Sequence, residues 1–219
     1  MAEKKTKAAG NARGRGRPSL QAADVKRQAL IDAARKLLVK NDPALLTRLM
    51  VATEAGVDPN LIRYYFGHMD QLLTEVIAGT HRQARDEMAA RSLDSGPVER
   101  LRYKVHRSFR MFVENPNHHK LVALTLYGNE TSEAHSDWSA ILESSLDDLR
   151  DILKSGQHEG LMREVEPRFL HMLIISACEF WASNEPLISL LFGANRDKGY
   201  VEQRYVDFIF DILMNGLRP

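Results

Sequence analysis

The sequence predicts an all-α protein made of a small three-helix domain followed by a larger helical domain. Apolar residues recur at spacings of three and four along most of the chain, which is the period of a helix. No segment shows the alternating pattern of a strand, and no repeat of fixed period is present. With 219 residues, 44% of them hydrophobic, the chain can bury a substantial core.

Charge is distributed unevenly along the chain. Residues 1–70 contain 13 Lys and Arg against 7 Asp and Glu, a net charge of +6, whereas residues 71–219 contain 17 against 22, a net charge of −5. A basic N-terminal third on an acidic body predicts that this third meets a polyanion. A solvated basic tail is the alternative.

Residues 1–23 are expected to form a flexible basic arm, because they are rich in Ala, Gly, Lys and Arg and nearly lack large apolar side chains. Within them the segment "RGRGRPS" alternates Arg with Gly and resembles an AT-hook. Glycine lets a backbone lie in a narrow minor groove, where Arg13, Arg15 and Arg17 would meet negative potential. The hypothesis is minor-groove binding, and simple solvation of the arm is the alternative.

A three-helix unit is predicted over residues 24–70. Its first helix is expected to begin with Asp24 as N-cap and to end at the "NDP" of residues 41–43. A second, short helix is predicted over Thr47–Ala55, with Thr47 able to cap it. Gly56 then supplies the left-handed residue that a tight helix C-terminus favours.

The third helix is predicted from the pair Asp58-Pro59. The Asp58 carboxylate can accept free backbone N–H groups, and proline suits the first helical position. Ile62 and Phe66 are four residues apart, so they share one face and are expected to point into the core. The opposite side carries Pro59, Asn60, Leu61, Arg63, Tyr64 and Tyr65.

Two short helices joined by a tight turn describe a helix-turn-helix, and the major groove of a duplex admits one such helix. The residues on its outer side suit that task. Arg63 can contact guanine or a phosphate, Asn60 can pair with adenine, and Leu61 can meet a thymine methyl group. Tyr64 and Tyr65 can donate their phenol O–H groups to phosphates, which positions the helix without reading sequence.

The stretch "ATEAGVDPNLIRYYFGHMDQLL" resembles the DNA-binding domain of the TetR (tetracycline repressor) family. The resemblance covers roughly residues 25–77. It implies a homodimer that places two recognition helices in successive major grooves of a palindrome, and repression relieved by a small ligand in the larger domain. It also implies that Thr47 and Arg48 meet phosphates. Met69 departs from the family pattern, which usually has lysine there.

Residues 71–219 are expected to form the helical ligand-binding and dimerisation domain. Its two C-terminal helices are so apolar that both sides of each must be buried. A four-helix interface between two subunits would bury them, and core burial within one subunit is the alternative. The candidate interface residues are Phe169, Leu173, Phe180, Tyr205, Phe208, Ile209 and Ile212.

A pocket for an unknown small-molecule effector is expected among the central helices. The candidate lining residues are aromatic or charged side chains beside the apolar stripes. They are Arg102, His106, Phe109, Tyr127, Trp138, His171 and Trp181. Taken singly, each also fits a surface or core position.

Several other classes of protein are not supported by the sequence. Cys178 is the only cysteine, so no intrachain disulfide or cysteine-rich metal site can form, and its apolar neighbours indicate an inert thiol. We find no glycine-rich phosphate loop, zinc motif or nucleophile elbow, and we expect no enzyme, no cofactor and no metal.

The N-terminus lacks a hydrophobic signal core, and no apolar run is long enough to span a bilayer. We therefore expect a cytoplasmic, nucleoid-associated protein that does not contact a membrane. Its function is predicted to be that of a DNA-binding transcriptional regulator, most simply a repressor. An architectural or chromosome-organising protein on the same scaffold, without an effector, is the alternative.

Overall fold

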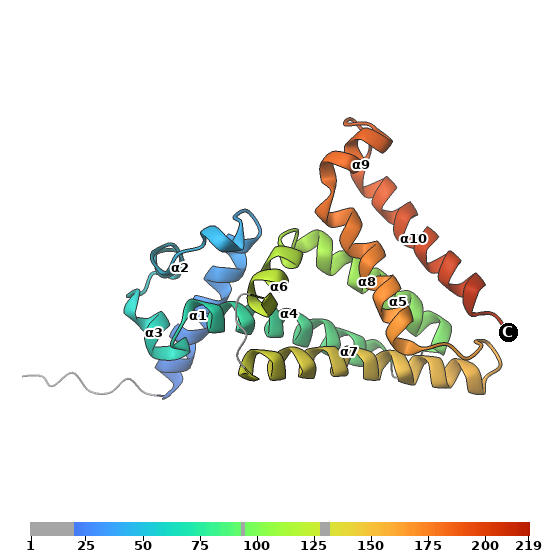
Figure 1. Cartoon of the computed structure of the whole chain (residues 1–219), viewed down its shortest axis with the longest axis horizontal. Helices are drawn as coiled ribbons and strands as arrows, with labels where there is room; N and C mark the ends of the chain where they lie inside the picture. The colour runs from blue at the N-terminus through green and yellow to red at the C-terminus, as the bar shows by residue number, and fades with distance from the viewer. Residues whose placement is uncertain (1–19, 93–94, 128–131) are drawn as a thin grey trace, which may run out of the picture.

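The computed structural model describes residues 20–92, 95–127 and 132–219 (Figure 1). Within these ranges every regular element is a helix, which confirms the all-α prediction. In chain order the elements are α1 (Leu20–Leu38), η1 (Pro43–Leu45), α2 (Arg48–Ala55), α3 (Asn60–Phe66), α4 (Met69–Ser92), α5 (Pro97–Glu114), α6 (His118–Tyr127), α7 (Ser132–His158), α8 (Pro167–Ser183), α9 (Glu185–Phe192) and α10 (Lys198–Leu217).

Helix α1 begins at Leu20, earlier than the sequence predicted. Asp24 therefore lies inside the helix, and its expected role as N-cap is wrong. The end of α1 lies closer to its predicted position. Asn41 Nδ2 donates to the carbonyl of Leu37 at 2.8 Å and so satisfies a carbonyl that has no partner within the helix. Asp42 then caps η1 by accepting from the N–H of Ala44 at 3.0 Å.

The turn between α2 and α3 follows the predicted chemistry. Thr47 is the N-cap of α2, and its hydroxyl oxygen accepts from the N–H of Met50 at 3.3 Å. Gly56 ends α2 in the left-handed conformation, with φ 65° and ψ 33°. The Asp58 carboxylate accepts from the N–H of Asn60 at 2.7 Å and so caps α3. These local bonds fix the direction in which α3 leaves the turn.

Replacing Gly56 with alanine should destabilise the protein by about 1 kcal/mol, because a left-handed backbone is strained for any residue with a Cβ. Urea unfolding would measure the loss. Gly216→Ala is the matched control, since an added Cβ meets no atom within 4 Å at either position but only Gly56 has a positive φ. Equal stability of Gly56→Ala and the wild type would contradict this account.

Two separate cores hold the molecule together. The N-terminal core joins α1, α2 and α3 to the first turns of α4, and includes Leu30, Ile62, Phe66 and Leu72. It also takes in residues from α6 and α7, so the larger domain packs directly on the smaller one. The second core fills the space between α5, α7, α8 and α10. Figure 1 shows α8, α9 and α10 projecting at the opposite end from α1–α3.

Candidate DNA-binding surface and effector cavity

Helix α3 presents one face to the core and one to solvent. Ile62 and Phe66 are buried, as predicted. Tyr64 is 72% exposed, which is unusual for a large aromatic side chain and leaves its phenol free to meet a partner. The exposed face also includes Pro59, Asn60 and Arg63.

Leu61 and Tyr65 differ from the rest of the expected DNA-contacting set, because both are half-buried and pack against the N-terminal core. The ring of Tyr65 lies edge-on between Tyr64 and Phe66, with centroids 4.9 Å and 6.3 Å away. Tyr65 therefore supports α3 from the side. The exposed face is narrower than the sequence predicted and is centred on Arg63 and Tyr64.

Cations near this face are available for an external anion. Thr47 and Arg48 are exposed at the start of α2. Within the described residues, Arg48 and Arg63 form no ion pair, whereas Lys36 pairs with Glu54. The N-terminus of α2 adds the favourable end of a helix dipole. The arm residues Arg13, Arg15 and Arg17 lie outside the part of the chain that the structure describes.

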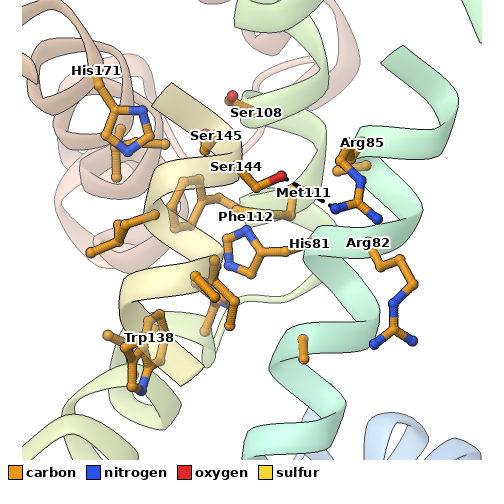
Figure 2. A pocket seen from close by; sticks show the side chains of 18 of the residues that line it. His81, Arg82, Arg85, Ser108, Met111, Phe112, Trp138, Ser144, Ser145 and His171 are labelled. Atoms are coloured by element: carbon orange, nitrogen blue, oxygen red, sulfur yellow. Dashed lines mark hydrogen bonds between the residues drawn. The ribbon is translucent and has the colours of Figure 1, made fainter. Parts of the chain in front are cut away.

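A cavity of about 600 Å³ lies between α4, α5, α6, α7 and α8. Two of the predicted effector residues, Trp138 and His171, line it. Figure 2 shows side chains from α4 and α7 converging there, with His81 pointing from α4 toward α7. Polar residues outside the predicted set also line it, among them His81, Lys104, Arg107 and His118.

Two buried cations come from consecutive turns of α5. Lys104 is 9% exposed, and its Nζ donates to the carbonyl of Ser145 at 3.0 Å. Burial lowers the pKa of Lys104, and the nearby Asp148 charge partly opposes that effect. Arg107 is also buried and places its Nε 2.5 Å from a carboxylate oxygen of Glu87. Arg107 thus has a carboxylate in direct contact, whereas Lys104 has a carbonyl in contact and the Asp148 charge farther away.

Two of the cavity histidines, His81 and His118, are neutral near pH 7. Burial, followed by the positive charges of His171, Lys104 and Arg107, lowers the pKa of His81 to about 4. Burial also lowers the pKa of His118 to about 3. Both imidazoles therefore lose their protons well below neutral pH and act as aromatic, hydrogen-bonding groups.

The seven predicted effector residues do not line one pocket. Arg102, His106 and Phe109 line a separate surface groove between α5 and α10. There Arg102 lies over the ring of Phe210, 3.9 Å from its centroid, and His106 Nε2 lies 3.1 Å from Asp207.

Two further predicted effector residues also lie away from the cavity. Tyr127 is 76% exposed. Trp181 is buried in the second core and stacks on Tyr205. Periodicity identified the right helices for these residues but not the direction in which each side chain points.

The predicted interface residues fall into two groups. Tyr205 and Ile209 face inward, with the Tyr205 hydroxyl donating to the carbonyl of Ala177 at 3.0 Å. The other five are large apolar side chains that the single chain leaves exposed. They are Phe169, Leu173, Phe180, Phe208 and Ile212. Core burial within one subunit therefore does not account for these five.

Cys178 is a buried thiol whose pKa is raised by burial to about 12, so it is protonated and unreactive at neutral pH. Among the described residues, no cluster of His, Cys, Asp or Glu has the arrangement of a metal site. Within the same ranges, no helix combines the length and apolarity needed to cross a membrane.

Family models match most of this fold. Residues 30–76 match the model described as "Bacterial regulatory proteins, tetR family", and residues 97–213 match "Tetracyclin repressor-like, C-terminal domain". The second match alone spans more than half of the chain. The first coincides with the stretch whose sequence resembled the TetR DNA-binding domain.

Individual proteins that resemble this chain are also named as transcriptional regulators. The chain is 25% identical over 201 residues to the HTH-type transcriptional repressor NicS of Pseudomonas putida, covering 90% of this chain and 95% of that protein. It is 38% identical over 94 residues to the HTH-type transcriptional regulator BetI of Agrobacterium fabrum, covering 42% of this chain and 46% of that protein.

Solved structures share the fold at low identity. The transcriptional regulator FadR from Bacillus subtilis, in complex with stearoyl-CoA, superposes with a TM-score of 0.62 at 18% identity, covering 84% of this chain and 97% of that one. A TetR-family regulator from Mesorhizobium loti gives 0.65 at 16% identity, covering 90% and 98%. This chain belongs to the TetR family of bacterial regulatory proteins and is a transcriptional regulator, not an enzyme.

Proposed function

We propose that this regulator is a repressor that binds a palindromic operator as a homodimer and leaves it when a small-molecule effector enters the cavity. The observation that carries this proposal is the position of α6. His118, His119 and Val122 of α6 line the cavity, while the same helix contacts the DNA-binding domain. One short helix is thus shared by the effector site and the DNA-binding unit.

The contacts between α6 and the DNA-binding domain are polar and specific. Asn117, directly before α6, donates through Nδ2 to the carbonyls of Leu38 and Asn41 at 2.9 Å and 3.1 Å. These carbonyls lie where α1 ends. Lys120 Nζ lies 2.9 Å from Asp42, and this hydrogen bond lowers the pKa of the Asp42 carboxyl. A displacement of α6 would therefore move the end of α1 and η1.

Such a displacement is enough to couple the two sites. An effector that binds better to one position of α6 shifts the protein toward that position, and DNA shifts it back if the operator favours the other. In a dimer, a small rotation of each DNA-binding domain changes the separation of the two α3 helices. Successive major grooves lie about 34–36 Å apart, so that separation decides whether both helices fit.

Dimerisation itself is supported by the exposed apolar residues of α8 and α10. Residues that share one face of α8, Phe169, Leu173 and Phe180, remain open to solvent, as do Phe208 and Ile212 on α10. An apolar surface of this kind marks an interaction site. Two copies related by a two-fold axis would cover it with a four-helix interface.

The relatives support both parts of the proposal, which are repression and the binding of a small molecule. NicS is named a repressor, and the FadR structure holds stearoyl-CoA, so proteins of this fold can accept a small molecule. In our proposal the arm adds minor-groove contacts through Arg13, Arg15 and Arg17, and the protein acts in the cytoplasm on the nucleoid.

Fluorescence anisotropy with the DNA upstream of the protein's own gene tests the proposal, using a random duplex as competitor across a salt series. Binding that survives the competitor, with two or four chains per site, would support an operator-specific dimer. Release of that DNA by a compound that also raises the melting temperature would support effector control. Weak binding that both salt and competitor abolish would instead favour the architectural function.

Replacing Arg63 with alanine should weaken operator binding by about 1–3 kcal/mol and relax the preference at one base pair, if the side chain reads a base edge. Tyr64→Ala should weaken binding to all sequences alike, because phosphate contacts carry no sequence information. Anisotropy against a set of single-base operator variants separates the two effects. Arg218→Ala, at the exposed C-terminus, is the charge-matched control. Uniform loss on every operator would reject base reading by Arg63.

A further inference from the structure

We propose that the effector cavity takes an organic carboxylate, with its anionic group at Lys104 and a flat, apolar body against the aromatic wall. This inference rests on the proposed function, since it names the chemical class of the effector. It is carried by three features of the cavity: a buried cation with no carboxylate in contact, unpaired donors in the lining, and an aromatic surface of suitable size.

The buried cation is Lys104. It is one of the few buried charged side chains in the described chain, and its ammonium group has three N–H donors. One of them is bonded to the carbonyl of Ser145, and among the described residues no carboxylate lies within 4.0 Å of Nζ. Asp148 and Glu179 also line the cavity but are half-buried and form no ion pair with Lys104. A buried charge with no counter-ion in contact is costly, and a bound anion lowers that cost.

The other polar groups of the lining also favour an anionic ligand. His81 Nε2, Trp138 Nε1 and Arg107 Nη1 are enclosed and have no hydrogen-bond partner among the described residues. The Trp138 and Arg107 groups are obligatory donors, and neutral His81 can present a donor as well. The three donors come from α4, α7 and α5, and Lys104 and Arg107 add two buried cations to the same lining. An anion would therefore meet donors from several helices.

The apolar part of the cavity favours a flat molecule. The rings of His81 and His118 lie 5.5 Å apart, and Phe112 meets His118 edge-on at 5.4 Å. Trp138 stands 6.5 Å from His81, also edge-on. Because both histidines are neutral, this wall behaves as an aromatic surface on which another ring can pack. A volume of about 600 Å³ is large enough for a ligand with one or two rings.

A set of probes that share one skeleton tests the proposal: 1-naphthoate, the neutral 1-naphthamide and the cationic 1-naphthylmethylammonium. We expect the carboxylate to raise the melting temperature and to bind at least about tenfold more tightly than the other two by calorimetry. Octanoate should bind more weakly than 1-naphthoate, because an aliphatic chain has no ring to pack on the aromatic wall. Lys104→Met should weaken carboxylate binding about ten- to a hundredfold. Lys154→Met, on the exposed side of α7, is the matched control and should bind like the wild type.

Folding of the variant is checked with the same melting curves. Unliganded Lys104→Met should melt at or above the wild-type temperature, because the substitution removes a buried charge and keeps the aliphatic stem. If it does not fold, Lys104→Gln serves as the second variant, since it removes the charge but keeps a donor.

Three results would overturn the proposal: no binding of either carboxylate at millimolar concentration, equal or tighter binding of the amide or ammonium compound, or unchanged carboxylate affinity in the folded Lys104 variants. Failure of the proposed function looks different. A carboxylate that binds through Lys104 but leaves operator affinity unchanged would contradict effector control while supporting the anion site. A cationic compound that binds and makes the protein leave the operator would support effector control while contradicting the anion site.

Discussion

Replacing Phe208 with glutamate should convert the proposed dimer to a monomer and weaken operator binding about a hundredfold or more. Phe208 is 61% exposed in the single chain, so the substitution leaves the core of each subunit intact. In the dimer it would place a carboxylate in an apolar interface without a partner, which disfavours association. A monomer then binds one half-site at a time and loses the gain of about 10²–10⁴ that a second linked site provides.

The geometry of α8 and α10 explains why one residue can have this effect. Phe169 and Leu173 are four residues apart on α8, as are Phe208 and Ile212 on α10, so each pair forms a stripe along its helix. Burying one large apolar side chain contributes about 1.5–3 kcal/mol. An interface that depends on a few such side chains is sensitive to a charge near its centre.

Light scattering coupled to size-exclusion chromatography measures the mass, and anisotropy with the operator measures the affinity. Leu161→Glu is the control: this apolar residue is also exposed, but it lies in the connection between α7 and α8, away from both stripes. A Phe208→Glu protein that remains a dimer with unchanged operator affinity would place the subunit interface elsewhere.

The fold could be predicted largely because its signals are local. Thr47 caps α2 and Gly56 ends it through bonds to residues within five positions, so the turn is set by its own sequence. Ile62 and Phe66 face the core because four residues make about one helical turn. Helix α9 was not predicted, since it is only eight residues long and only Asn184 separates it from α8.

The effector cavity could not be predicted in the same way, because it depends on which helix packs against which face of α5. Lys104 lies on the face toward α4 and α7, Arg102 and His106 lie on the face toward α10, and Arg107 borders both. All four are polar residues beside one apolar stripe, so the sequence pattern alone does not say which of them faces the cavity. A signal was nevertheless present: Leu101 and Lys104 are three residues apart, so the lysine shares a face with a core leucine.

Replacing Trp181 with alanine should destabilise the protein by about 3–5 kcal/mol, the usual range for removing a buried tryptophan. Trp181 is 2% exposed and stacks on Tyr205 with ring centroids 4.3 Å apart. Phe109 and Phe192 approach the same indole at 6.2 Å and 5.7 Å. These rings come from α5, α9 and α10, so the alanine would leave a void where three helices meet α8.

The outcome decides between the two roles considered for Trp181, because a core residue and an effector ligand respond differently. Urea unfolding should show the full loss for Trp181→Ala and a much smaller one for Trp181→Phe. The indole Nε1 has no hydrogen-bond partner among the described residues, so Trp181→Phe loses packing contacts but no hydrogen bond. If Trp181→Ala unfolded like the wild type but no longer responded to the effector, the indole would be a ligand contact after all. We expect the reverse, since the cavity lies on the other side of α8, where His171 and Ile175 line it.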